Sequence, residues 1–178
     1  MSRTVFYTAA TLDGFLADEH DSLAWLFKQE IDESGPMSYG EFIAGVGAGC
    51  LGWTTYDWVL DHEQGRWSYP DLPMWLFTHR EVEPVPGVTV ARGDVRPVHA
   101  AMVEAAAGKD VWVVGGGDLA AQFAEAGLLD RVMVSVAPVT LGAGRPLLPR
   151  PFDLRLDAVA RNGAFACLEY DVVGPLTT

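Results

Sequence analysis

The chain has 178 residues, of which 49% are hydrophobic and 20% are charged, and this composition excludes an intrinsically disordered protein. Its 24 acidic residues against 12 basic ones give a formal net charge of −12, which repels nucleic-acid backbones and anionic lipid surfaces. We therefore expect neither a nucleic-acid partner nor a membrane partner. The length suits one domain, and we expect residues 1–178 to form a single one.

Export and metal-binding signals are missing from the sequence. The N-terminus lacks the long apolar stretch of a signal peptide, and no apolar run approaches the ~20 residues of a membrane span, so we expect a cytoplasmic protein. Cys50 and Cys167 each lie in an apolar run, and neither belongs to a metal-ligand spacing. We expect two buried core thiols and no metal site.

The first half of the chain alternates between strand and helix signals. Short runs rich in β-branched, aromatic or small apolar residues indicate strands, and apolar residues at helical spacing indicate helices. The predicted elements are a strand at 4–9, a helix at 23–31, a helix at 39–46, a strand at 48–52 and a helix starting at 54–56.

The second half continues this alternation and ends in two strands. The predicted elements are strands at 74–78 and 88–91, a helix at 95–107, a strand at 111–114, a helix from 117 to 127, a strand at 131–139, a rigid loop at 140–151, and strands at 154–160 and 164–173. Asn162-Gly163 between the last two strands is a strong hairpin signal. The pattern predicts an α/β sandwich with a mostly parallel sheet and a C-terminal antiparallel hairpin.

The segment most informative about function is the buried strand that ends in Gly115-Gly116-Gly117 and runs into a helix. Glycine lets the backbone approach a phosphate closely, and the first N–H groups of the helix point at such an anion. A tight turn without a ligand is the alternative. The spacing from Gly115 to Ala120 also fits a Rossmann fingerprint, but the acidic residue that this fold needs about 20 residues later is missing. The sequence therefore predicts phosphate binding without Rossmann topology.

Two further strand-to-helix or strand-to-loop junctions carry polar residues. Gly52 is followed by Thr54 and Thr55 at a helix start, where the hydroxyls could hold a phosphate oxygen or simply cap the helix. Thr78, His79 and Arg80 follow another strand and form a partly cationic patch suited to the extra phosphate of NADP, or else a solvated loop. We expect the three junctions to converge on one dinucleotide at the strand ends.

The order of these motifs resembles the dihydrofolate reductase-like superfamily, and most of all the branch that includes the reductase domain of bacterial riboflavin biosynthesis. The resemblance rests on five segments, Thr11–Ala17, Gly52–Tyr56, Val111–Leu119, Leu129–Arg131 and Pro138–Leu147. It implies a three-layer α/β/α sandwich that works as a homodimer. It also implies an NADPH-dependent oxidoreductase acting on a small heterocyclic or carbonyl/imine substrate, similar to 5-amino-6-(5-phosphoribosylamino)uracil reductase and dihydrofolate reductase.

The resemblance also implies roles for particular residues. Gly52, Thr54 and Thr55 would contact cofactor phosphates, Thr78, His79 and Arg80 would face the adenosine 2′-phosphate, and Gly115, Gly116, Gly117, Asp118 and Leu119 would cradle the pyrophosphate. The Asp13 turn would border the nicotinamide. Two positions depart from the branch, since Trp53 replaces its usual arginine and Arg131 replaces its usual glutamate.

Reduction of a C=N or C=O bond needs a hydride and a proton. By location, Asp13 and Asp21 are the candidate catalytic acids, although Asp13 is equally suited to form a turn and Asp21 to cap a helix. Trp25, Phe27, Tyr56 and Trp58 are candidates to stack on a flat substrate, or else belong to the core.

Two functions of other classes stay open. One is a non-catalytic protein that binds a dinucleotide or a pterin. The presence of Trp53 where the branch has arginine favours this alternative. The other is a structural dimer that binds no nucleotide.

Overall fold

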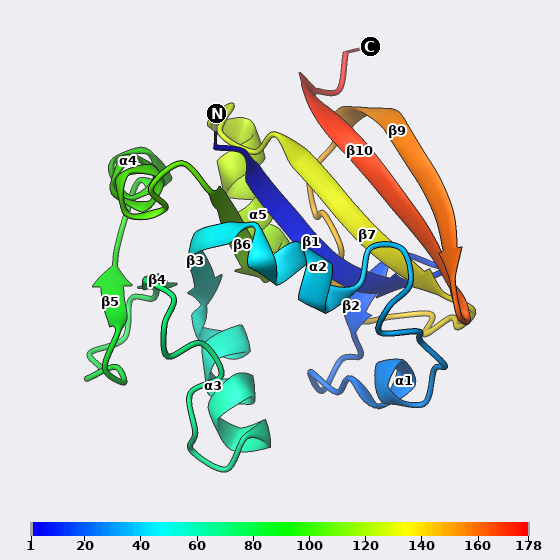
Figure 1. The fold of residues 1–178 in the computed structure, drawn as a ribbon, viewed down its shortest axis with the longest axis horizontal. Helices are drawn as coiled ribbons and strands as arrows, with labels where there is room; N and C mark the ends of the chain where they lie inside the picture. Colours follow the sequence, from blue (N-terminus) through cyan, green and yellow to red (C-terminus); the bar gives the residue numbers. More distant parts are fainter. Residues whose placement is uncertain (1, 178) are drawn as a thin grey trace.

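The computed structural model describes residues 2–177, which form an eight-stranded sheet in the order β5-β4-β3-β6-β1-β7-β10-β9 (Figure 1). The strands that pair in parallel are β1 (Thr4–Thr11), β3 (Val46–Gly52), β4 (Met74–Phe77), β5 (Val88–Ala91), β6 (Asp110–Gly115) and β7 (Arg131–Ala137). The last two strands, β9 (Phe152–Asn162) and β10 (Phe165–Pro175), form an antiparallel hairpin that extends the sheet beyond β7. The predicted mostly parallel sheet with a C-terminal hairpin is confirmed.

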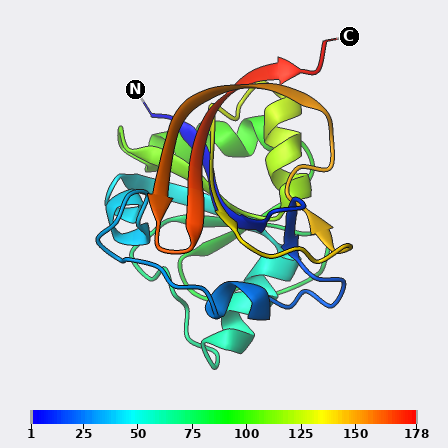
Figure 2. The ribbon, with the colours of Figure 1, turned by 90° about the vertical axis from the view of Figure 1, so that its right-hand side faces the viewer.

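Helices cover both faces of the sheet, which gives the predicted three layers (Figure 2). The helices are α1 (Ala24–Phe27), α2 (Tyr39–Ala44), α3 (Trp53–His62), α4 (Val95–Ala105) and α5 (Gly117–Glu125). Side chains alternate along the strands: Phe6 packs with α4 and α5, whereas Tyr7 stacks on Phe42 of α2 with ring centroids 4.1 Å apart. On the α2 face, Leu51 packs against Tyr56 of α3. No helix within residues 2–177 is long and apolar enough to cross a membrane.

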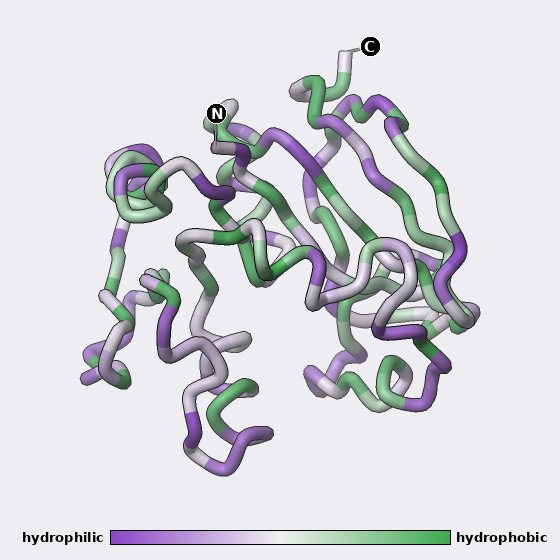
Figure 3. Tube along the Cα trace, in the orientation of Figure 1, coloured by the Kyte–Doolittle hydropathy of each residue, from purple (hydrophilic) through white to green (hydrophobic). Residues whose placement is uncertain are grey.

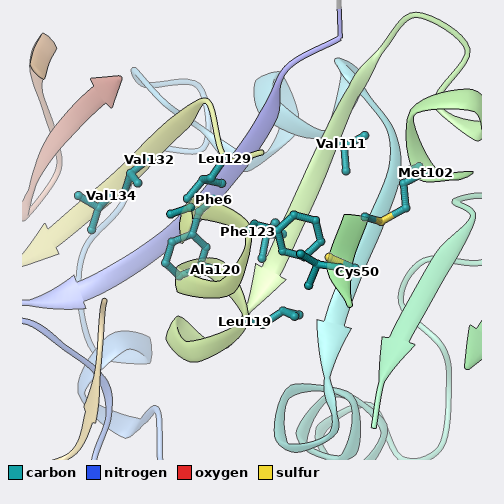
Figure 4. Close-up of a cluster of buried hydrophobic side chains, with 14 of the residues drawn as sticks. Phe6, Cys50, Met102, Val111, Leu119, Ala120, Phe123, Leu129, Val132 and Val134 are labelled. Atoms are coloured by element: carbon teal, nitrogen blue, oxygen red, sulfur yellow. The ribbon is translucent and has the colours of Figure 1, made fainter. Parts of the chain in front are cut away.

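The largest cluster of buried side chains lies between the sheet and the α4–α5 layer (Figure 4). Helix α5 contributes Phe123, which is fully buried, and Ala120, whose small side chain lets the helix approach the strands closely. Cys50 from β3 joins the same cluster, and burial raises the pKa of its thiol. Cys167 is also buried and free, so the predicted core thiols are confirmed.

The segment predicted as a loop at 140–151 contains one strand of a small second sheet. Strand β2 (Phe15–Ala17) pairs antiparallel with β8 (Arg145–Pro146), with Ala17 opposite Arg145. Gly144 precedes this pair with a φ of 152°, and a Cβ at that position would collide with the carbonyl of Ala17. The glycine therefore lets two segments far apart in sequence meet beside the end of β1.

Several predicted boundaries differ from the structure by a few residues, and two of the differences have a clear structural cause. The helix expected at 23–31 is limited to α1, which begins without a side-chain cap and turns only Trp25 into the core. The hairpin loop is Gly163-Ala164, one residue later than predicted, because Asn162 still pairs with Phe165. The buried Asn162 amide donates to the carbonyls of Asp32 and Pro36 at 3.0 Å, so it is a tertiary anchor and not a turn residue.

The hairpin leaves β9 as an exposed edge strand, along which hydrophobic and hydrophilic residues alternate (Figure 3). Its Val159 side chain is 63% exposed, in contrast to the fully buried Phe123 of α5.

These two positions give a matched test of the core. Replacing Phe123 with alanine should lower the free energy of unfolding by about 3–5 kcal/mol, because the substitution leaves a cavity between α5 and the sheet. Replacing Val159 with alanine should change it by less than about 0.5 kcal/mol. Urea unfolding followed by circular dichroism measures both, and equal effects would contradict the placement of the core.

Candidate functional site

A cavity of about 760 Å³ lies at the carboxyl-end edge of the sheet. Its wall contains the last residues of several parallel strands or the residues that follow them, among them Gly52, Phe77, Ala91 and Gly115. Parallel strands all end at the same edge, so residues distant in sequence meet there. The three junctions singled out from the sequence are brought together, because β4, β3 and β6 are neighbours in the sheet.

Two helices begin at this cavity without a side-chain cap. Helix α3 has Gly52 as its N-cap and α5 has Gly116, and no side chain accepts from their first N–H groups. Thr54 and Thr55 therefore do not cap α3, which was one of the open alternatives. The unpaired N–H groups and the positive ends of both helix dipoles make this part of the wall suitable for an anion.

The three consecutive glycines have separate structural reasons. A Cβ at Gly117 would collide with the carbonyls of Pro146 and Leu147, and a Cβ at Gly115 would lie 3.1 Å from the hydroxyl oxygen of Thr55. A Cβ at Gly116 would meet no protein atom within 4 Å, and Gly116 lines the cavity. The fold itself thus requires glycine at 117 and leaves little room for a side chain at 115, whereas Gly116 keeps space in the cavity open for a ligand.

Basic side chains gather where β4 and β5 end. His79 and Arg92 line the cavity, and Arg92 also donates to the carbonyl of Arg80 at 3.1 Å. Arg80 lies beside the wall, with its guanidinium 4.9 Å from the centroid of the Trp53 ring. Arg92 is not among the residues predicted from the sequence, although its position directly after a short strand and before a glycine could have indicated it.

The opposite end of the cavity, beside β1 and β2, is largely apolar. Leu16, Leu23, Leu26 and Trp58 form its wall, and the Trp58 ring stacks on His62 with centroids 4.5 Å apart. Asp21 lies at this end and forms an ion pair with Arg145. Since α1 begins at Ala24, Asp21 is not the helix cap that the sequence left open.

The cavity wall includes every predicted cofactor residue except Arg80: Gly52, Thr54, Thr55, Thr78, His79, Gly115, Gly116, Gly117, Asp118 and Leu119. Asp118 is the member of this set whose charge opposes an anion. Arg150 offsets that charge, because its guanidinium lies 2.8 Å from the Asp118 carboxylate.

Two of the four predicted stacking residues, Trp25 and Tyr56, lie in the core, outside the cavity wall. Trp25 is 6% exposed and packs with Ala137 and Phe165. Tyr56 is 4% exposed, and its hydroxyl accepts from the backbone N–H of Val85 at 3.0 Å. Trp58, two residues further along α3, was also predicted and does line the cavity, whereas the predicted Phe27 is exposed and lies outside the wall.

Asp13 also lies outside the cavity wall and holds the 138–144 loop. Its carboxylate accepts from the Thr11 hydroxyl at 2.6 Å and from the backbone N–H groups of Leu141 and Gly142 at 3.0 and 2.7 Å. These bonds, that of Thr11 first, lower the pKa of Asp13 below its usual range. The geometry makes Asp13 a clamp between the end of β1 and the loop that leads into β8.

The fold is that of dihydrofolate reductase-like proteins. The structure resembles that of the dihydrofolate reductase from Enterococcus faecalis complexed with NADP(H) and RAB-propyl, with a TM-score of 0.58 and 13% identity over 96% of each chain. It is also similar to a putative riboflavin biosynthesis protein from Shewanella sp. PV-4, with a TM-score of 0.80 and 21% identity over 96% of this chain and 98% of that one.

Sequence comparison identifies the family within this class. Residues 54–161 match the RibD C-terminal domain family, and the chain belongs to that family. It is 30% identical over 172 residues to the uncharacterized protein YwjB of Bacillus subtilis strain 168, covering 94% of this chain and 97% of YwjB. The resemblance stated from the motifs is confirmed.

The clamp predicts a pH dependence of stability. Because folding lowers the pKa of Asp13, the unfolded chain binds the proton more tightly, and the stabilisation by the carboxylate is lost as the pH falls below about 4. Asp13→Asn should therefore be less stable than the unmodified protein at pH 7, and the difference should shrink towards pH 3. Urea unfolding at both pH values measures it, and a difference independent of pH would contradict this role.

Proposed function

We propose that the chain is an NADPH-dependent reductase that transfers a hydride to a C=N or C=O carbon of a small substrate. The observation that carries this proposal is one continuous cavity with three chemically distinct parts: cationic strand ends, two uncapped helix starts and an apolar end. A dinucleotide has the same order of parts. Family membership and the similarity to a dihydrofolate reductase complexed with NADP(H) support the assignment.

The residues present fit such a cofactor. The N–H groups at the starts of α3 and α5 would hold the pyrophosphate, with Gly116 leaving the space that its oxygens need. His79, Arg80 and Arg92 would hold the 2′-phosphate of the adenosine. Arg92 is paired with Glu81, whose side chain is 89% exposed, and a phosphate can replace so weak a partner.

When bound, the nicotinamide supplies the hydride. The protein positions the reacting atoms: Thr8 and Ala9 of β1 form the wall where the nicotinamide would lie, and Leu16 and Leu26 provide an apolar surface beside it. Asp13 acts from outside the cavity as a positioning residue for the neighbouring loop. Asp21 and Arg145 keep side chains that are 35% and 56% exposed, so solvent reaches this end and supplies the proton.

A non-catalytic dinucleotide-binding protein is the second candidate. The specific observation in its favour is that both carboxylates in the described cavity wall are already ion-paired, Asp21 with Arg145 and Asp118 with Arg150. NADPH oxidation measured with a panel of pterins, flavins, pyrimidines and quinones separates the two candidates. Tight NADPH binding without turnover of any of them would favour the binding protein.

Replacing Gly116 with valine tests the proposed pyrophosphate position. The side chain would project into the cavity and weaken NADPH binding by at least about 10-fold, while the unfolding transition should stay close to that of the unmodified protein because no protein atom is displaced. Quenching of tryptophan fluorescence by NADPH measures the affinity. Gly40→Ala is the control, since Gly40 also has free space around its Cβ position but lies in α2, outside the cavity wall. Unchanged NADPH affinity in Gly116→Val would refute the site.

Replacing Arg92 with glutamine tests the proposed 2′-phosphate position. Loss of a charge-assisted hydrogen bond should weaken NADPH binding by about 10-fold or more and leave NADH binding nearly unchanged. The ratio of the two dissociation constants is the measurement. Arg66→Gln serves as control because it removes the same charge from an exposed side chain outside the wall. An equal loss of NADH affinity would argue against a phosphate contact.

A further inference from the structure

The ion pair between Asp21 and Arg145 at the apolar end of the cavity contains two hydrogen bonds, which engage both carboxylate oxygens and two guanidinium nitrogens. The Nε of Arg145 donates to one carboxylate oxygen of Asp21 at 2.6 Å, and its Nη2 donates to the other at 3.1 Å. Two parallel bonds of this kind are stronger and better oriented than a single surface contact. Arg145 therefore presents less donor capacity to a ligand than an unpaired arginine would.

Backbone structure holds the two partners in place. Asp21 has a φ of 62° in a tight turn, and the carboxylate of Asp18 fixes that turn by accepting from the N–H groups of His20 and Ser22 at 2.8 and 2.9 Å. Arg145 is held by the pairing of β8 with β2, where it lies opposite Ala17. The pair thus connects two preformed segments and does not depend on two free side chains meeting.

The electrostatic surroundings of the pair are acidic. Asp18 and Glu19 act on Arg145 in addition to Asp21, and the bond to Asp21 is the main reason why the pKa of the Arg145 guanidinium is raised. The other arginine of the described cavity wall is Arg92, which lies at the end formed by β5. Hence an anionic group at the apolar end would find one guanidinium, already paired, and an excess of carboxylates.

The remaining wall at this end is apolar and includes a flat ring. Leu16, Leu23, Leu26 and Trp58 offer surface for a planar apolar compound, and none of them can bind an anion. A phosphate placed against these side chains would lose part of its hydration without gaining donors in return.

We propose that the substrate is an uncharged planar compound, and that Asp21 excludes anionic substrates by occupying Arg145. The inference rests on the proposed function, because it takes the apolar end as the place of the substrate. The inference distinguishes this chain from 5-amino-6-(5-phosphoribosylamino)uracil reductase, the enzyme suggested by the sequence resemblance, whose substrate carries a phosphoribosyl group. Asp21 is in this view a specificity-determining residue, since it withholds the guanidinium from a competing anion.

Two compounds with the same ring system test the inference, 1,2-naphthoquinone and its 4-sulfonate. With the full chain and NADPH, kcat/KM should be at least about 10-fold higher for the uncharged quinone. Asp21→Asn frees the guanidinium, so this preference should fall by about 10- to 100-fold, the range that a charge-assisted hydrogen bond contributes. Equal use of both quinones by the unmodified protein, or an unchanged preference in Asp21→Asn, would overturn the inference.

Arg145→Gln is the matched control. It breaks the same ion pair but removes the cation, so discrimination against the sulfonate should persist or increase. Relief of discrimination in both variants would show that loosening of the loop, and not the freed guanidinium, admits the anion, and would overturn the role of Asp21. Asp61→Asn removes one negative charge from an exposed position of α3 outside the wall and should leave the ratio unchanged.

Binding separates this inference from the proposed function. The affinity of the NADPH-loaded protein for each quinone, measured by quenching of tryptophan fluorescence, should show the same ranking as turnover. Ranked binding without turnover would contradict the reductase and support the inference, whereas failure of both quinones to bind would overturn it.

Discussion

The parallel pairing of β3 with β6 is the contact on which the candidate site depends. Cys50 lies opposite Val113 and Leu51 opposite Gly115, so the two strands end side by side. Each strand then turns directly into a helix whose first N–H groups have no side-chain cap. Two helix starts at one sheet edge place more unpaired donors and more positive dipole than either helix could supply alone. The candidate anion site is therefore a consequence of strand register.

A second constraint joins the remaining parts of the cavity to this edge. The Asp13 carboxylate holds the N–H groups of Leu141 and Gly142, and the β2–β8 pairing then carries the chain to the carbonyls that pack on Gly117. The loop after β7 is thus fixed at both ends, by an ionised side chain and by backbone pairing. The same loop carries Arg145, so the Asp13 clamp also helps to fix the position of the Asp21–Arg145 ion pair.

The parts of the fold that the sequence predicted are those with a local physical signal. The runs at 48–52 and 111–114 read as strands because both of their faces are buried, and the glycines at 115–117 predicted the junction that lines the cavity. Asn162-Gly163 indicated the hairpin, but its turn lies one residue later because Asn162 is needed to anchor the 32–36 segment.

What the sequence could not predict depends on contacts between distant segments. Aromatic side chains of α3 at positions 56 and 58 look alike in the pattern, and only packing decides that Tyr56 joins the core while Trp58 reaches the cavity. Asp21 and Arg145 are separated by 124 positions, and neither shows in its own surroundings that it has an ionic partner. The Asp13 carboxylate was visible as a turn residue, yet its bonds to the loop after β7 depend on the completed sheet.

The net charge of −12 raises the question of how such a protein could hold a highly anionic cofactor. Interactions between exposed charges are screened beyond about 8 Å at physiological ionic strength, so the surface acids act weakly inside the cavity. Backbone N–H groups at helix starts bind anions without any ionised side chain, and Arg92, which lines the cavity after β5, adds to them locally. At the apolar end neither source of attraction is available, and the local excess of carboxylates determines the sign of the potential. One cavity can therefore hold an anion at one end and reject it at the other, because short-range donors and not the total charge decide each contact.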